Sequence, residues 1–228
     1  VPNRLALADA PNREDFTDGA PRRLSYAELD REVDRVATLI RARGAVAGDI
    51  VVYQLPNIVE SAILFLACAR AGVVASPLLV QFDSNEIDYV VGKLQPRLFI
   101  AGRFKTRDLA ANAAPICEKA GCTLIRAEEL LAGDAAPEPV APSGRDGDDV
   151  VTICWTSGTE GRPKGVMRTA NNWFVTGRNM VHGAALGDGE VILNIRPLVN
   201  MAAIGGSFMS WLATASTLIL HHPLDIGL

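Results

Sequence analysis

The pattern of apolar and polar positions predicts a helix that begins at Ser25 and ends before Gly44. A serine followed three residues later by a glutamate, here Glu28, is the signature of an N-terminal capping box, and a glycine commonly follows the last helical turn. Between these two signals the apolar residues recur three or four positions apart, as on one face of a helix. They are Leu29, Val33, Val36, Ala37 and Ile40.

Short apolar runs then alternate with helical patterns. Asn57 with Glu60 and Asp83 with Glu86 are expected to begin two helices, and Gly72 is expected to end the first of them. Pro115 is expected to bend or split a third helix. Strands separated by helices of this length need crossover connections, so the sheet should be largely parallel with helices on both faces. The expected strands are 50–55, 73–79, 98–101 and 123–125, and the helices between them are 57–69, 83–95 and 108–120.

Prolines and glycines replace large apolar residues between 133 and 149, which indicates a linker. We therefore expect an α/β protein with largely parallel sheets flanked by helices. Its first subdomain would cover 1–132, and a second subdomain would cover 150–228, where the pattern stops before a helix completes the sheet. In this second unit the expected strands are 150–155, 190–195 and 217–220, and the expected helices are 169–185 and 201–213.

One segment is long and apolar enough to raise the question of a membrane span. Residues 197–220 carry no charge, and about 20 apolar residues suffice to cross a bilayer. The segment also contains many hydroxyl groups and ends in a β-branched run, which favours a buried helix followed by a buried strand. We therefore expect no transmembrane segment.

Composition and charge narrow the class of protein further. The chain has 228 residues, of which 49% are hydrophobic and 21% charged, as in folded globular proteins. The net charge of −4, without a basic run, argues against a nucleic-acid partner. Four cysteines without a C-x-x-C pair fit a reduced, cytoplasmic compartment, and Cys117 and Cys122 are expected to be buried packing residues.

The segment that carries the chemistry directly follows the predicted strand 150–155. Its glycines let the backbone turn so that several N–H groups point at one anion, its hydroxyls add donors, and Lys164 adds a compact positive charge. This combination predicts a cradle for a triphosphate. The segment reads Thr156-Ser157-Gly158-Thr159-Glu160-Gly161-Arg162-Pro163-Lys164-Gly165-Val166.

Two other interpretations of this loop have weaker support. The Walker pattern requires four residues between its glycines and a hydroxyl residue after the lysine, whereas Gly158 and Gly161 enclose two and Gly165 follows Lys164. A surface turn rich in serine and glycine would explain the glycines and hydroxyls but not the Pro-Lys-Gly ending.

The loop resembles the signature S/T-S-G-T-T-G-x-P-K-G-V of the adenylate-forming superfamily, which includes acyl-CoA ligases, amino-acid adenylation domains and luciferases. Other stretches occur in the family's order: Leu24–Leu29, Gly48–Val52, Leu55-Pro56-Asn57 and Ala71–Val74. The resemblance covers almost the whole chain and implies an N-terminal domain like that of acetyl-CoA synthetase. The family's later adenine, ribose and C-terminal lysine segments do not occur here, so the chain is expected to be a truncated ligase, about its first two fifths.

This resemblance implies that the parent protein activates a carboxylic acid with ATP and then transfers the acyl group to coenzyme A. Lys164 would be the catalytic cation, and Mg²⁺ would lie at Thr159. Asn200, Met201 and Gly205 would contact the acid, because Pro197-Leu198-Val199-Asn200-Met201 matches the family's acyl-pocket segment. The expected ATP-binding residues are Thr156, Ser157, Gly158, Thr159, Glu160, Gly161 and Lys164.

Two positions depart from the family pattern. Glu160 replaces the second threonine of the signature, and a carboxylate beside a triphosphate is unfavourable unless it points away, pairs with Arg162 or reaches a metal. Asn200 is neutral where amino-acid adenylation domains carry an aspartate for the substrate ammonium, which favours a fatty or aromatic acid. Asn200 is equally well suited to be a helix N-cap.

Alternatives remain open at this stage. The loop could hold a nucleotide without catalysing a reaction, in a binding module, or the parent could be another adenylate-forming enzyme such as an amino-acid adenylation domain. In every case residues 1–228 alone are expected to be inactive, to bind ATP weakly and to self-associate through an exposed apolar edge.

Overall fold

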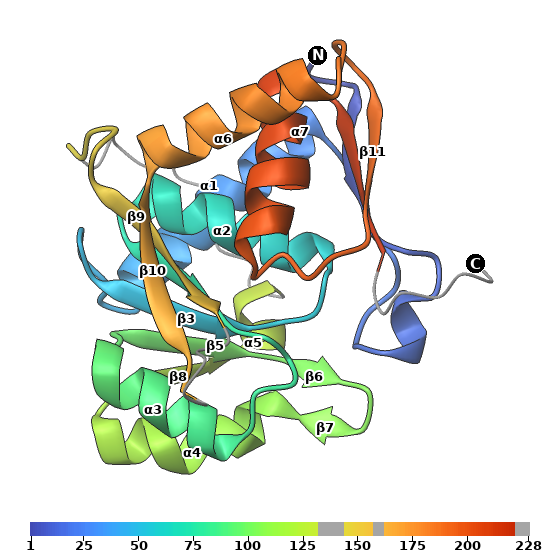
Figure 1. Cartoon of the computed structure of the whole chain (residues 1–228). Coiled ribbons are helices and arrows are strands. Elements are labelled where there is room, and N and C mark those ends of the chain that lie inside the picture. The colour runs from blue at the N-terminus through green and yellow to red at the C-terminus, as the bar shows by residue number, and fades with distance from the viewer. Residues whose placement is uncertain (132–143, 157–161, 222–228) are drawn as a thin grey trace.

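The computed structural model describes residues 1–131, 144–156 and 162–221. Its main element is a six-stranded sheet with the order β10-β9-β4-β3-β5-β8. All neighbouring strands in this sheet are parallel except β10, which pairs antiparallel with β9 (Figure 1). The strands are β3 (Ile50–Gln54), β4 (Val74–Pro77), β5 (Leu98–Ala101), β8 (Thr123–Arg126), β9 (Val150–Thr156) and β10 (Lys164–Thr169).

A second sheet joins the two ends of the described chain. Its order is β11-β12-β1-β2, with β1 parallel to β12 and antiparallel to β2. The β11 and β12 strands are also parallel. The strands are β1 (Leu5–Ala8), β2 (Arg23–Ser25), β11 (Val191–Asn194) and β12 (Thr217–Leu220), and a small hairpin consists of β6 (Arg103–Phe104) and β7 (Arg107–Asp108).

Helices cover both faces of the six-stranded sheet, which confirms the expected α/β class. One core packs α1 and α2 against the sheet, and a separate core packs α3 and α4 on the opposite face (Figure 1). Beyond α2, the first core continues to α6, α7 and the four-stranded sheet. The helices are η1 (Arg13–Asp15), α1 (Tyr26–Ala42), α2 (Val59–Ala71), α3 (Ser84–Leu94), α4 (Leu109–Ala120), α5 (Ala127–Leu131), α6 (Ala170–Gly183), η2 (Ala203–Phe208) and α7 (Met209–Thr214).

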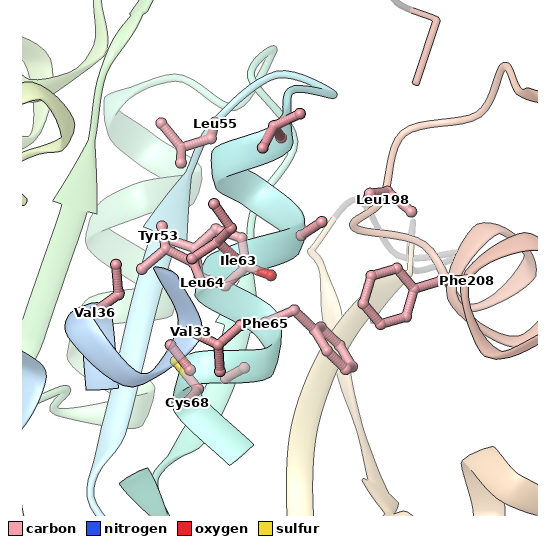
Figure 2. Close-up of a cluster of buried hydrophobic side chains, with 14 of the residues drawn as sticks. Val33, Val36, Tyr53, Leu55, Ile63, Leu64, Phe65, Cys68, Leu198 and Phe208 are labelled. Carbon is pink, nitrogen blue, oxygen red and sulfur yellow. The ribbon is translucent and has the colours of Figure 1, made fainter. Parts of the chain in front are cut away.

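Aromatic side chains join α2 to the helical segment near the end of the chain. The rings of Phe65 on α2 and Phe208 on η2 meet edge to face, with centroids 4.9 Å apart (Figure 2). Phe208 packs in turn against Trp211 of α7, at 5.1 Å. Pairs of this geometry add stabilisation beyond area burial, so η2 and α7 are held firmly over α2.

Local capping signals predicted several helix boundaries correctly. Ser25 with Glu28 and Asp83 with Glu86 form complete capping boxes at the starts of α1 and α3. Gly72 ends α2 in the left-handed conformation, with a φ of 75°. In each case the signal works over a few neighbouring residues, so the sequence alone suffices to locate the boundary.

Other predicted features need correction. The second helix does not begin at Asn57: it begins at Val59, whose N–H donates to Asp9 Oδ1 at 2.8 Å. Pro115 does not split α4, which runs unbroken from Leu109 to Ala120. The helix expected over 201–213 contains a π-helical segment, η2, before α7. The β1, β2 and β10 strands were not predicted.

Strands that precede the linker expected at 133–149 pair with strands that follow it. The β9 and β10 strands follow that segment but extend the sheet formed by β3, β4, β5 and β8, whereas β1 and β2 pair with the later β12. The division into subdomains 1–132 and 150–228 thus remains a prediction, and the sheets are not divided along it. Among the described residues, no helix has both the length and the apolarity needed to span a membrane.

An exposed apolar edge is present, as expected. Val191 and Leu193 on the edge strand β11 are 65% and 58% exposed. Edge strands of this kind can pair with other chains. Self-association of the chain itself stays a prediction.

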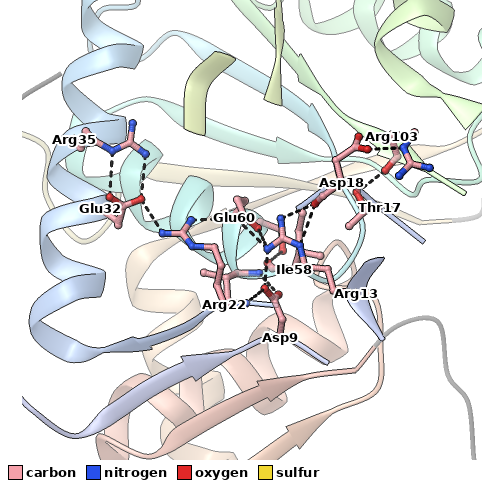
Figure 3. A network of polar contacts seen from close by, with 12 residues as sticks. Asp9, Arg13, Thr17, Asp18, Arg22, Glu32, Arg35, Ile58, Glu60 and Arg103 are labelled. Atoms are coloured by element: carbon pink, nitrogen blue, oxygen red, sulfur yellow. Dashed lines mark hydrogen bonds and ion pairs between the residues drawn. The ribbon is translucent and has the colours of Figure 1, made fainter. Parts of the chain in front are cut away.

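A buried ion-pair network connects the N-terminal segment with α2 (Figure 3). Arg13 lies 2.7 Å from Asp9 and 2.9 Å from Glu60, and all three side chains are at most 5% exposed. Arg22 extends the network from Glu60 to Glu32. Nε and the second terminal nitrogen of Arg13 each donate to the carbonyl of Asp18, so every nitrogen of the buried guanidinium has a hydrogen-bond partner.

We expect Glu60→Gln to lower the free energy of unfolding by about 3 kcal/mol, because it leaves a buried guanidinium short of one negative partner. Urea denaturation of the purified protein measures this change. The control is Asp88→Asn, which removes an exposed ion pair with Lys119 and should change stability by less than about 0.5 kcal/mol. Equal effects of the two substitutions would contradict the structural importance of the network.

Candidate functional site

The predicted phosphate-binding loop connects β9 and β10 as a hairpin. Thr156, the last residue of β9, is the register partner of Lys164, the first residue of β10. The Thr156 hydroxyl donates to the Lys164 carbonyl at 3.4 Å. The two described ends of the predicted site are therefore adjacent. The expected ligands between them, Ser157, Gly158, Thr159, Glu160 and Gly161, lie outside the described residues.

The hairpin lies at the carboxyl edge of the parallel sheet. The β9 strand runs parallel to β4, which runs parallel to β3, so the end of β9 at Thr156 shares an edge with the ends of those strands. Open α/β sheets bind their ligands at this edge. The position of the loop in the fold therefore suits a ligand site, and the exposed side chain of Lys164 is accessible there.

An aromatic side chain fixes the base of the hairpin. Trp155 donates its Nε1–H to the Ser76 hydroxyl on β4 at 2.9 Å. Its ring meets Tyr89 of α3 edge to face, with centroids 6.4 Å apart. The guanidinium of Arg162, just before Lys164, lies 5.8 Å from the centre of the Tyr89 ring. Both sides of the loop are thus held against the same helix.

Gly165 lies close to Ile153 and to its partner across the hairpin, Trp155. Gly165 and Trp155 are register partners. A Cβ on Gly165 would lie 3.0 Å from Ile153 Cγ2 and 3.4 Å from the Trp155 ring. The glycine after the lysine therefore has a packing role, which the motif alone did not indicate. Nearby Cys154 is buried, and burial raises the pKa of its thiol to about 11, so this thiol is neutral.

The side of the hairpin that faces α3 is acidic. A cavity of about 410 Å³ lies between the first turns of α3 and the end of the loop. Arg162 faces the carboxylates across this cavity, whose lining comprises Asp83, Asn85, Glu86, Asp88, Tyr89, Arg162 and Pro163. Arg162 thus supplies positive charge between the acidic helix and the loop.

A buried asparagine attaches the predicted acyl-pocket segment to the main sheet. The Asn57 side chain donates to the Arg196 carbonyl at 2.6 Å and accepts from the Leu198 N–H at 2.7 Å. Asn194 donates to the same Arg196 carbonyl at 2.8 Å. Pro197 and Val199 line a narrow cavity together with the loops that follow β3 and β4. This segment therefore lies at the carboxyl edge too.

Asn200 acts as a helix cap in the structure. Its Oδ1 accepts the Ala203 N–H at 2.8 Å, and its carbonyl accepts the Ile204 N–H at 3.1 Å. Of the two interpretations of Asn200, the capping one is thereby confirmed. The Asn200 side chain is half-buried, and its contact with the acid stays a separate prediction.

Gly205 and Met201 differ in how deeply they are buried. Gly205 is buried where η2 crosses α6, and a Cβ there would lie 2.6 Å from Thr176 Cγ2. The packing of η2 against α6 therefore needs a residue without a side chain at this position. Met201 is partly buried and packs against the main hydrophobic core. Substrate contact by either residue remains a prediction.

Sequence analysis missed the residues that position these segments. Asn57 was interpreted as a helix start, and Trp155 and Tyr89 were given no role. Asn57 stands among apolar residues at the end of a strand, where a buried polar side chain needs partners. This context was a usable signal that the residue bonds to a distant backbone.

A largely parallel sheet with helices on both faces, and with a hairpin and an exposed lysine at its carboxyl edge, defines the chain as an α/β protein. The match to known families is specific. The chain belongs to the AMP-binding enzyme family, whose model matches residues 3–226.

Relatives and solved structures agree with this assignment. The chain is 35% identical over 204 residues to a feruloyl-CoA synthase of Amycolatopsis sp, covering 90% of this chain and 40% of the relative. It is 29% identical to an acetyl-coenzyme A synthetase of Penicillium chrysogenum, covering 99% of this chain and 35% of the relative. The ATP-bound crystal structure of MatB from Rhodopseudomonas palustris superposes with a TM-score of 0.83 at 26% identity, over 98% of this chain and 43% of that one.

The chain thus spans about 40% of the length of the relatives it matches. The acetyl-CoA-synthetase-like N-terminal fold expected from the sequence is confirmed by these comparisons. The two relatives compared by sequence are named as a feruloyl-CoA synthase and an acetyl-coenzyme A synthetase.

We expect Asn57→Ala to lower the free energy of unfolding by about 2 kcal/mol, because it leaves the buried Leu198 N–H without its acceptor and removes one of the two donors to the Arg196 carbonyl. Chemical denaturation followed by tryptophan fluorescence measures the change. The exposed Asn85→Ala serves as the matched control and should shift stability by less than about 0.5 kcal/mol. A neutral Asn57→Ala would show that segment 196–198 is held by other contacts.

Proposed function

We propose that the parent protein is an ATP-dependent, AMP-forming carboxylic acid:CoA ligase, and that this chain contributes its phosphate-binding hairpin and part of its acid site. The observation that carries the proposal is the pairing of Thr156 with Lys164 at the carboxyl edge of the sheet. It holds a hydroxyl and an exposed cation at the two ends of a glycine-rich loop. The ATP-bound structural relative and the CoA-synthetase relatives support the same reaction class.

The proposed reaction has two steps. In the first, the carboxylate of the acid attacks the α-phosphorus of ATP, and pyrophosphate leaves with the electron pair of the broken P–O bond. In the second, the thiol of coenzyme A attacks the acyl carbon of the adenylate, and AMP leaves. The first step concentrates negative charge on phosphoryl oxygens, where a fixed cation and N–H donors stabilise the transition state.

Within this scheme Lys164 is the proposed catalytic cation, and Thr156 begins the set of phosphate ligands. Ser157, Gly158, Thr159, Glu160 and Gly161 complete the proposed cradle, with Thr159 as the proposed neighbour of Mg²⁺. When bound, Mg²⁺ would neutralise part of the phosphate charge. Trp155 and Tyr89 are proposed to keep the cradle at the sheet edge while the phosphates bind.

The proposed substrate is a fatty or aromatic acid. Asn200 is neutral, so it offers no countercharge for the ammonium group of an amino acid. Val199 lines the narrow cavity beside Asn57 and adds apolar surface. Feruloyl-CoA synthase and a medium-chain fatty-acid–CoA ligase of Escherichia coli, 28% identical over 193 residues, are relatives named for aromatic and fatty acids. A cytoplasmic location and inactivity of residues 1–228 alone stay predictions.

Lys164→Ala in the complete polypeptide should slow acid-dependent pyrophosphate release by about 10²- to 10³-fold, the usual loss when one oxyanion-stabilising donor is removed. The side chain is exposed, so the fold should be unaffected, and the unfolding midpoint checks this. Lys119→Ala removes another exposed lysine, on α4, and should retain full activity. Unchanged pyrophosphate release by Lys164→Ala would refute the phosphate-binding role.

A panel of acids in the same assay should show turnover of fatty or aromatic acids and little turnover of amino acids. Asn200→Asp sharpens this test, because aspartate still caps a helix but places a negative charge at the proposed acid site. We expect an unchanged unfolding midpoint and a several-fold loss of activity with the preferred acid. Full activity of Asn200→Asp would limit Asn200 to its capping role, and preference for an amino acid would overturn the substrate class.

A further inference from the structure

Two cysteines are brought together where α4 ends. Gly121 follows the helix in the left-handed conformation, with a φ of 68°, and its N–H donates to the Glu118 carbonyl at 3.2 Å. The Cys122 N–H donates to the Cys117 carbonyl at 2.9 Å. These two bonds define the Schellman motif, in which the side chains of the first and last residues pack against each other. In this chain both of those side chains are thiols.

The two thiols influence each other's ionisation. The neighbouring Cys122 thiol lowers the pKa of Cys117, and the Cys117 thiol together with burial raises the pKa of Cys122. Cys122 also donates to the Thr123 carbonyl at 3.9 Å. The other two cysteines differ, because burial raises the pKa of Cys68 to about 12 and that of Cys154 to about 11.

We propose that Cys117 and Cys122 are a thiol modification site that closes reversibly into an intrachain disulfide. The 2.9 Å bond from the Cys122 N–H to the Cys117 carbonyl brings the two residues together, and the Schellman turn sets their side chains on the same side, so a disulfide needs no large backbone movement. Gly121 makes this possible, since its positive φ turns the chain back on the helix end. The proposal concerns α4 and β8 and is independent of the function proposed for the β9–β10 hairpin.

Access to the pair comes from the end of the helix. Cys122 is 8% exposed and Cys117 1%, and residues 118–121 and 123 on either side of Cys122 are exposed. Pro115 lies inside α4 and supplies no N–H to the carbonyl of Ala111, which removes one bond from this short helix. Local opening of helix ends needs much less free energy than global unfolding, so a small oxidant reaches this pair more easily than the core cysteines.

The proposed chemistry is thiol–disulfide exchange with a low-molecular-weight disulfide. The Cys117 thiolate attacks one sulfur of that molecule, forms a mixed disulfide and expels one thiolate. Cys122 then loses its proton to water, attacks the Cys117 sulfur and expels the second thiolate, which completes the protein disulfide. The pair is oxidised by two electrons, and the small disulfide is reduced to two thiols.

The test uses the native protein, oxidised glutathione and mass spectrometry. Trypsin cleaves after Lys119, so Cys117 lies in peptide 108–119 and Cys122 in peptide 120–126. After oxidation of the folded protein, alkylation and digestion, we expect these two peptides to be joined and to separate on treatment with dithiothreitol. Peptides 44–70 and 146–164 carry Cys68 and Cys154 and should remain reduced and alkylated in the same sample.

The variant Cys122→Ser distinguishes the two steps of the exchange. It keeps the backbone turn but removes the resolving thiol, so Cys117 should accumulate as a mixed disulfide with glutathione. Absence of this adduct would overturn the assignment of Cys117 as the attacking thiol. In the unmodified protein, absence of the joined peptides, or equal oxidation of all four cysteines, would overturn the modification site, and this result does not depend on the folding of any variant.

Discussion

The arrangement of the two sheets depends on one buried charge, the guanidinium of Arg13. Arg13 joins the N-terminal segment to α2, because Asp9 and Glu60 supply the negative charges and the Asp18 carbonyl accepts from Nε and from the second terminal nitrogen. A buried cation is tolerated only when its partners surround it. The segment that follows β1 must therefore fold against the start of α2, and this contact fixes the four-stranded sheet beside the six-stranded one.

The same network reaches the proposed site through the start of α2. Asp9 caps this helix from a distance, since its Oδ1 accepts the Val59 N–H. Asn57, two positions earlier, is thereby free of a capping role and bonds instead to Arg196 and Leu198. One end of the helix thus holds the N-terminal segment, the main sheet and the segment before Asn200 in fixed relation. Charge burial and site geometry are consequently linked by contiguous hydrogen bonds.

Features that depend on interactions between near neighbours in the sequence were predicted, and features that depend on distant partners were not. The capping boxes at Ser25 and Asp83 and the terminating Gly72 act within a few residues, and each was predicted. Asn57 has a side chain suited to a helix cap, but its partners lie far along the chain. The local pattern therefore predicted a helix start there, which is wrong. Strands β1 and β2 were missed for a similar reason, because β1 gains its parallel partner only when β12 returns to it.

The candidate site shows the same division. Lys164 was predicted from its motif, and its register with Thr156 follows from a hairpin that sequence analysis did not predict. Trp155 supplies the missing constraint, because its hydrogen bond to Ser76 and its contact with Tyr89 tie the hairpin to β4 and α3. These contacts hold the two described ends of the loop, Thr156 and Lys164, at the carboxyl edge of the sheet. Groups that are already ordered lose less conformational freedom on binding, so the proposed role of Lys164 draws on a position that strand pairing and Trp155 have fixed beforehand.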